Sequence, residues 1–180
     1  GKFGHRQAIA LLHGTDDANV PYGQSVGGRE AYRDQGYPMV HLRTLWGRDH
    51  RPHWVEAACE LAWCEGMVSP DPARVGSCLD TLVGSKSDYG LDFAAIWGVA
   101  SRLEKLAGAP ADLTSRAAKL RAAVEEQAAA VVAALDEDLG PKGKLSKVDG
   151  KPWPGLALRL PEDFGGVPPS ADWSQAHADD

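Results

Sequence analysis

Two short apolar segments on either side of a helix-length stretch constrain the fold of this chain more than any other feature. The first, Gln7–His13, is nearly continuously apolar, and the second is Met39–Leu45. Such strands are typical of a parallel sheet that is covered on both faces. Between them, Gln24–Gln35 reads as a helix that ends at Gly36, because glycine readily adopts the left-handed conformation found just past a helix end. With a further helix predicted over Trp54–Glu65, the order is strand, helix, strand, helix.

Two parallel strands are not expected to form a stable sheet alone, since they leave unpaired edges and an uncovered apolar face. We therefore expect the two strands to be the last part of a larger parallel sheet whose earlier strands lie outside this chain. The first residue is Gly1 rather than Met, so we expect a processed or partial product. The helix predicted at Trp54–Glu65 has residues typical of helix ends on both sides. Pro52 stands near its first turn, and Gly66 stands just past its end.

A helical region follows a turn at residues 69–72. Helices are predicted over Ala73–Val83, Leu91–Leu106 and Leu113–Leu135. The last of these has apolar residues at alternating spacings of four and three, and Asp112 precedes it as a cap. Antiparallel packing against Leu91–Leu106 explains this apolar stripe, and a seam between two copies of the chain is the alternative.

Residues 140–180 hold half of the 12 prolines of the chain and predict an extended arm. One strand is expected there at Leu156–Leu160, and Trp153, Phe164 and Trp173 are candidate anchors for the arm on a surface. The chain thus divides into three predicted parts, an α/β segment over 1–68, a helical region over 69–139 and the arm over 140–180.

Composition and charge exclude some classes of protein. Hydrophobic residues make up 43% of the chain, which is ordinary for a globular protein. The net charge of the chain is −6, so it lacks the excess of basic residues that is typical of a nucleic-acid-binding protein. No apolar run approaches the roughly 18 residues of a membrane span. Cys59, Cys64 and Cys78 form neither a disulfide framework nor a paired metal motif, so we expect small buried side chains, with a redox or ligand role as the alternative.

An acid and a histidine follow the two predicted strands. Asp17 comes directly after the first strand, and His50 comes shortly after the second. Loops at the carboxyl ends of parallel strands meet at one edge of the sheet, where open α/β sheets bind ligands. A histidine can transfer a proton near neutral pH, and a carboxylate on its other nitrogen fixes the tautomer. The sequence therefore predicts a catalytic pair, with turn-capping and helix-capping roles as the alternative.

The stretch from Leu12 to Trp54 resembles the C-terminal part of the α/β-hydrolase fold, especially its esterase, depolymerase and peptidase-like members. The match to His-Gly-x-x-Asp-x-x-Val-Pro and to the later Gly-x-x-His consists of His13, Gly14, Asp17, Val20, Pro21, Gly47 and His50. The resemblance implies that Asp17, rather than Asp16, is the catalytic acid and that His50 is the general base. The fold class it implies is the end of a parallel hydrolase sheet, and the resemblance covers about a third of the chain.

Residues 23–27 match Gly-x-Ser-x-Gly, the motif of a nucleophile elbow, but their context differs. An elbow requires a buried strand that runs into the serine, whereas Pro21 interrupts the short segment before Ser25. The serine of the family also precedes the acid in the chain, and Ser25 follows Asp17. We therefore expect Ser25 to begin a helix, and His13 to belong to the acid motif rather than to an oxyanion loop.

The predicted function is that of a serine hydrolase segment for ester or amide substrates, either small molecules or peptides. It supplies Asp17 and His50, and the nucleophile comes from a missing N-terminal segment or chain, so activity alone is not expected. No cofactor or metal is expected. A metal site at His50 and His53, with Asp49 and His41, is the alternative for this loop, and Trp46 and Trp54 are expected to wall the pocket or to pack.

A non-enzymatic function is the second hypothesis. In this interpretation the chain is a scaffold derived from a hydrolase, and the helix at Leu113–Leu135 makes the functional contact, including self-association into a homo-oligomer.

Overall fold

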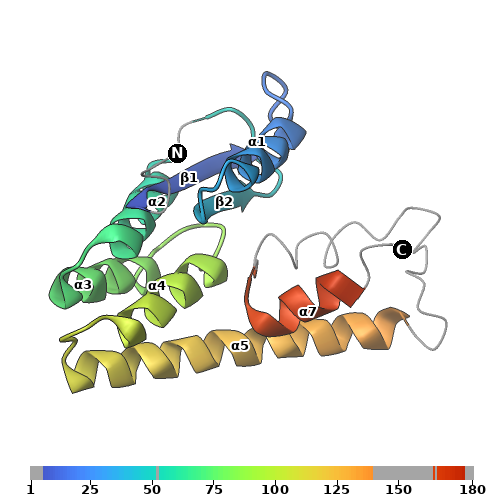
Figure 1. Cartoon of the computed structure of the whole chain (residues 1–180). Coiled ribbons are helices and arrows are strands. Elements are labelled where there is room, and N and C mark those ends of the chain that lie inside the picture. The colour runs from blue at the N-terminus through green and yellow to red at the C-terminus, as the bar shows by residue number, and fades with distance from the viewer. Residues whose placement is uncertain (1–5, 52, 140–163, 165, 177–180) are drawn as a thin grey trace.

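The protein combines a small parallel sheet with a set of packed helices (Figure 1). The structure, a computed structural model, describes residues 6–51, 53–139, 164 and 166–176, with only the backbone at 135, 137–139 and 174–176. Strand β1 (Ala8–Gly14) pairs in parallel with β2 (Met39–Leu45), from Ala8 opposite Met39 to Gly14 opposite Leu45. The helices are α1 (Tyr22–Asp34), α2 (Trp54–Val68), α3 (Pro72–Val83), α4 (Phe93–Lys105), α5 (Ala111–Leu139) and α7 (Pro168–Ala176). The mixed α/β class and the predicted strand–helix–strand–helix order are confirmed.

Helices cover the sheet on both faces. Successive side chains of a strand point to opposite faces, and in β2 the Thr44 hydroxyl lies 2.7 Å from the hydroxyl of Tyr22, the first residue of α1. The neighbouring Arg43 points the other way and donates to the carbonyl of Gly90, in the loop before α4. Strand β2 is accordingly buried almost throughout. Strand β1 is only half-buried over its first five residues, so its outer side is less covered.

The starts of α3 and α4 follow from local capping. Asp71 accepts a hydrogen bond from the backbone N–H of Ala73, and Pro72 occupies the first helical position. Asp92 accepts in the same way from Ala95. These are the residue types that satisfy the free N–H groups of a first turn. The helices predicted at Ala73–Val83 and Leu91–Leu106 are confirmed to within two residues at each end, whereas α5 extends four residues past the predicted end at Leu135.

Two details of the predicted helix ends are wrong. Helix α2 continues past Gly66 to Val68, because Gly66 has a packing role rather than a terminating one. A Cβ at Gly66 would lie 3.0 Å from both γ carbons of Val99 in α4, so a small residue lets these helices approach. Asp112 lies within the first turn of α5, where its charge favours the helix N-terminus without capping it. Pro52, expected near the first turn of α2, lies outside the described residues.

Helix α5 packs antiparallel to α4, as predicted. The indole N–H of Trp97 donates to Glu125, and the guanidinium of Arg121 contacts Glu104 at 2.7 Å. Trp97 precedes Glu104 in α4, whereas its partner Glu125 follows Arg121 in α5, so the two helices run in opposite directions. The apolar stripe of α5 is buried inside the chain, with Ala117 and the two further buried positions Val124 and Ala128. The stripe is therefore used in intramolecular packing.

One hydrophobic core joins α2, α3, α4, α5 and the C-terminal helix. Its fully buried members share aliphatic or aromatic side chains and include Trp63, Val75, Leu79, Leu82, Ile96, Val99, Leu103, Val124, Phe164 and Val167. Cys59 and Cys78 are buried, Cys64 is half-buried, and all three are free thiols, as the sequence predicts. Over the described part of the chain, every helix is too short or too polar to span a membrane.

The predicted extended arm is wrong for residues 168–176, which form α7 (Figure 1). Two prolines stand in its first turn, where the missing N–H groups cost nothing. Phe164 is buried and stacks on Phe93 with the ring centroids 5.0 Å apart. The Trp173 indole N–H donates to Asp136 of α5. Both aromatic residues therefore anchor this part of the chain, whereas Trp153 and Leu156–Leu160 lie outside the described residues.

Candidate functional site

Backbone hydrogen bonds hold together the two loops that leave the sheet. The N–H of Thr15 donates to the carbonyl of Leu45, and the N–H of Asp16 donates to the carbonyl of Arg48. The N–H of Gly47 donates to the Thr15 hydroxyl. Gly47 has a φ of 71°, in the left-handed region that favours glycine. The loop after β2 thus turns sharply back across the loop after β1.

This arrangement brings Asp17 against His50, as the sequence predicts. The Nδ1 atom of His50 lies 2.6 Å from Oδ2 of Asp17, although the two residues are 33 positions apart. The Asp17 side chain is only 4% exposed, whereas that of His50 is 59% exposed. An N–H at Nδ1 that donates to the carboxylate leaves the lone pair on Nε2. The exposed nitrogen is therefore the one able to accept a proton.

The Asp17 carboxylate accepts several hydrogen bonds. Its Oδ1 atom accepts from the backbone N–H groups of Asn19 and Val20, at 2.8 and 2.9 Å. Burial acts to raise the pKa of Asp17, but these N–H groups and His50 outweigh it and lower the pKa to about 2. Asp17 is therefore ionised at neutral pH, and it can stabilise a positive charge on the imidazole.

The Asp17 carboxyl should titrate with a midpoint near pH 2 in a carbon-detected NMR experiment, against an ordinary value of 3.8. Because the folded pKa lies below the ordinary value, the stability that this carboxylate contributes is complete above pH 3.8 and declines as the pH falls toward 2. His50→Ala removes one donor and should move the midpoint upward. A midpoint at or above 3.8 in the native chain would show that the carboxylate lacks these bonds.

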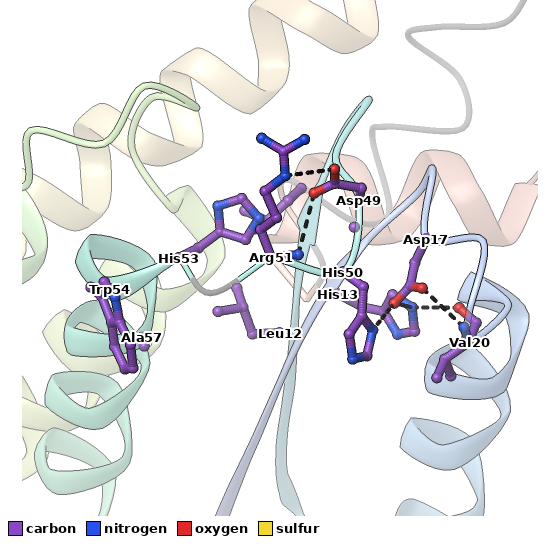
Figure 2. A pocket seen from close by; sticks show the side chains of 12 residues that line it. Leu12, His13, Asp17, Val20, Asp49, His50, Arg51, His53, Trp54 and Ala57 are labelled. Atoms are coloured by element: carbon purple, nitrogen blue, oxygen red, sulfur yellow. Dashed lines mark hydrogen bonds and ion pairs between the residues drawn. The ribbon is translucent and has the colours of Figure 1, made fainter.

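A second histidine, His13, also lies against Asp17 (Figure 2). Its Nε2 atom is 2.9 Å from the carbonyl oxygen of Val20 and 3.3 Å from Oδ2 of Asp17. Its Nδ1 atom is 2.5 Å from the hydroxyl of Ser25, in the first turn of α1. With Nε2–H donating to Val20, Nδ1 accepts from Ser25. His13 therefore joins the start of α1 to the loop that carries the acid, a role that the sequence does not indicate.

A pocket of about 390 Å³ opens beside the Asp17–His50 pair (Figure 2). Its lining combines the polar pair with apolar side chains, and comprises Leu12, His13, Gly14, Asp17, Val20, Leu45, Asp49, His50, Arg51, His53, Trp54 and Ala57. Trp54 lines this pocket, as one of the sequence interpretations expects, and Trp46 does not. Ser25 is absent from the lining. The pocket is open to solvent, so a molecule that enters it can reach His50.

The metal grouping considered from the sequence does not form. His41 lies away from His50 and His53, on the buried side of β2, where its Nε2 atom is 2.8 Å from Asp92. Asp49 is instead paired with Arg51. Among the described residues, the side chains that bring three metal-ligand atoms together are His41, Glu60 and Asp92. A histidine in a buried strand and a glutamate within an apolar helix were the signals available in the sequence.

Comparison with protein-family models, with curated proteins and with solved structures found no match to this chain.

Proposed function

We propose that this chain is the part of a serine hydrolase that supplies the acid and the general base, and that the attacking serine belongs to a segment outside these 180 residues. Asp17 orients His50 through Nδ1, and Nε2 of His50 takes the proton of the serine and returns it to the leaving group. This division of roles is the one implied by the resemblance to the C-terminal part of the α/β-hydrolase fold.

The observation that carries the proposal is the 2.6 Å contact between Asp17 and His50 beside an open pocket. The pair couples a carboxylate with a lowered pKa to a histidine ring whose other nitrogen is accessible. Both residues lie at the carboxyl ends of parallel strands, where ligands bind in open α/β sheets. A carboxylate that only capped a turn would not require an imidazole at its other oxygen.

The separate source of the nucleophile rests on two observations. The first is that Ser25 does not line the pocket, and its hydroxyl is bonded to His13. The second is that the outer side of β1 is only half-buried. A hollow of about 720 Å³ lies there, and Leu61 of α2, which lines it, is 71% exposed. Further strands of a larger sheet, added beside β1, would cover this surface and bring the serine and the oxyanion donors.

The pocket favours a substrate with an apolar group next to the bond that is cleaved. The apolar side chains of the lining are those of Leu12, Val20, Leu45, Trp54 and Ala57. An ester or amide of a small molecule or a peptide fits this chemistry.

The scaffold hypothesis has less support. It relies on the helix at Leu113–Leu135, and the apolar stripe of α5 is buried against α4 and the C-terminal helix.

A fluorophosphonate probe, which reacts with activated serines, tests the proposal. The probe should label the polypeptide that contains these residues together with the preceding segment, and the labelled residue should be a serine in that segment. The 180-residue chain alone should remain unlabelled. No labelling of the longer polypeptide under any condition would rule out the enzyme and favour the scaffold.

Ser25→Ala should leave probe labelling of the longer polypeptide intact. The change removes the hydroxyl that donates to His13 Nδ1, and the loss of such a bond costs about 1 kcal/mol of stability. A small drop in the thermal midpoint with unchanged labelling is therefore expected. Loss of labelling, with the fold preserved by circular dichroism, would instead identify Ser25 as the nucleophile.

A further inference from the structure

Three buried side chains from separate parts of the chain converge on the face of the sheet opposite α1. They are His41 of β2, Glu60 of α2 and Asp92, which caps α4. The Nε2 atom of His41 lies 2.8 Å from Asp92 Oδ2 and 3.7 Å from Glu60 Oε1. One ligand atom from each residue falls within 4.8 Å of the others. None of the three lines the Asp17–His50 pocket.

Glu60 is the unusual member of this group. Its side chain is only 7% exposed, and both carboxylate oxygens are buried without a hydrogen-bond partner among the described residues. A buried carboxylate normally accepts several hydrogen bonds or coordinates a cation, because leaving it unpaired is costly. Among the residues that the structure describes, Glu60 therefore has two acceptor atoms without a hydrogen bond, beside a histidine and a second carboxylate.

Asp92 is better compensated by neighbouring positive charges than Glu60 is. The Nε atom of Arg43 lies 3.6 Å from Asp92 Oδ2, while another of its nitrogens donates to a backbone carbonyl. Burial acts to lower the pKa of His41, but the charges of Asp92 and Glu60 outweigh it and raise the pKa to about 9. Burial raises the pKa of Glu60 to about 7. A divalent cation placed between the three side chains would take the place of the His41 proton and would give the Glu60 carboxylate a partner.

We propose that His41, Glu60 and Asp92 bind a divalent transition-metal ion, for which Zn²⁺ is the probe of choice. One imidazole nitrogen and two carboxylate oxygens are a ligand set that zinc accepts, with water in a fourth position. Bonds of about 2.0–2.2 Å in a tetrahedron place the ligand atoms roughly 3.3–3.6 Å apart, and the observed 2.8 and 3.7 Å bracket that spacing. Small side-chain shifts suffice, and binding displaces the Nε2 proton of His41.

Two features of the surroundings suit this site. Asp92 is oriented by the Ala95 N–H, which bonds to Oδ1 and leaves Oδ2 directed at His41. A hollow of about 370 Å³, lined by residues of β2, α1, α2, α4 and the C-terminal helix, borders the group of three at His41.

Calorimetric titration of the purified 180-residue chain with Zn²⁺, after treatment with a chelator, tests the proposal. The wild-type chain should bind one ion and unfold at a higher temperature when zinc is present. Glu60→Gln keeps the shape of the side chain and breaks no hydrogen bond to any described residue, so it should fold. It should weaken binding at least about tenfold, since even outer-shell substitutions cost roughly 10- to 100-fold.

Glu56→Gln is the matched control. Glu56 is also a buried glutamate of α2, but it accepts a hydrogen bond from the Ser87 hydroxyl and lies outside the group of three. Its zinc affinity should equal that of the wild type, and so should that of His50→Ala. Three results would each overturn the proposal, namely no zinc binding by the wild-type chain, unchanged binding by folded Glu60→Gln, or binding that is lost in His50→Ala.

Discussion

Replacing His50 with alanine is expected to lower kcat/KM on the order of 10⁴-fold or more in the polypeptide that joins these residues to the nucleophile. The same change should abolish labelling by the fluorophosphonate probe, because the serine is not activated without the general base. The His50 side chain is 59% exposed, so its loss should lower the thermal midpoint only slightly, through the lost bond to Asp17. The measurements are steady-state kinetics, probe labelling and thermal unfolding on the same preparations.

Asp17→Asn tests whether Asp17, rather than the adjacent Asp16, is the catalytic acid. The amide presents a different hydrogen-bonding pattern to His50 Nδ1, and loss of the carboxylate in such a relay costs on the order of 10⁴ in kcat. Asp16→Asn is the matched control, since Asp16 is exposed and contacts Thr15 rather than His50. An active His50→Ala enzyme, or equal effects of the two asparagine variants, would remove Asp17 and His50 from the mechanism.

Local sequence signals predicted the secondary structure well. The strand at Met39–Leu45 was predicted with its observed bounds, because an apolar run between turn residues reflects burial directly. The pairing of Asp17 with His50 was predicted from a two-part motif, and the structure places the two side chains 2.6 Å apart. Their catalytic roles, and the hydrolase family itself, remain predictions.

Features set by long-range packing could not be predicted. Gly66 looked like a helix end, although its small size is required where α2 crosses Val99 of α4. The contact of His13 with Ser25 joins the end of a strand to a helix start, and no pattern in either segment indicates it. His41, Glu60 and Asp92 come together only because β2, α2 and the start of α4, which are far apart in the sequence, meet in the fold.

Gly14→Ala is expected to cause the largest loss of stability among single-methyl changes near the site. A Cβ at Gly14 would lie 2.6 Å from the carbonyl carbon of Arg48 and 2.9 Å from the carbonyl oxygen of Asp49, with the Arg48 oxygen closer still. These are backbone atoms, so the loop that carries His50 must move away. Overpacking of this kind costs about 1–3 kcal/mol, a large share of a typical total of roughly 5–15 kcal/mol.

The displacement should also separate His50 from Asp17, because the hydrogen bond from the Asp16 N–H to the Arg48 carbonyl holds the two loops in register. We therefore expect Gly14→Ala to lose activity in the joined polypeptide and to raise the NMR titration midpoint of the Asp17 carboxyl in the 180-residue chain. Gly27→Ala is the control, since a Cβ there meets nothing within 4 Å in helix α1 and should add about 0.5–1 kcal/mol of stability. A Gly14→Ala chain as stable and active as wild type would mean that the two loops do not approach as closely as their backbone contacts imply.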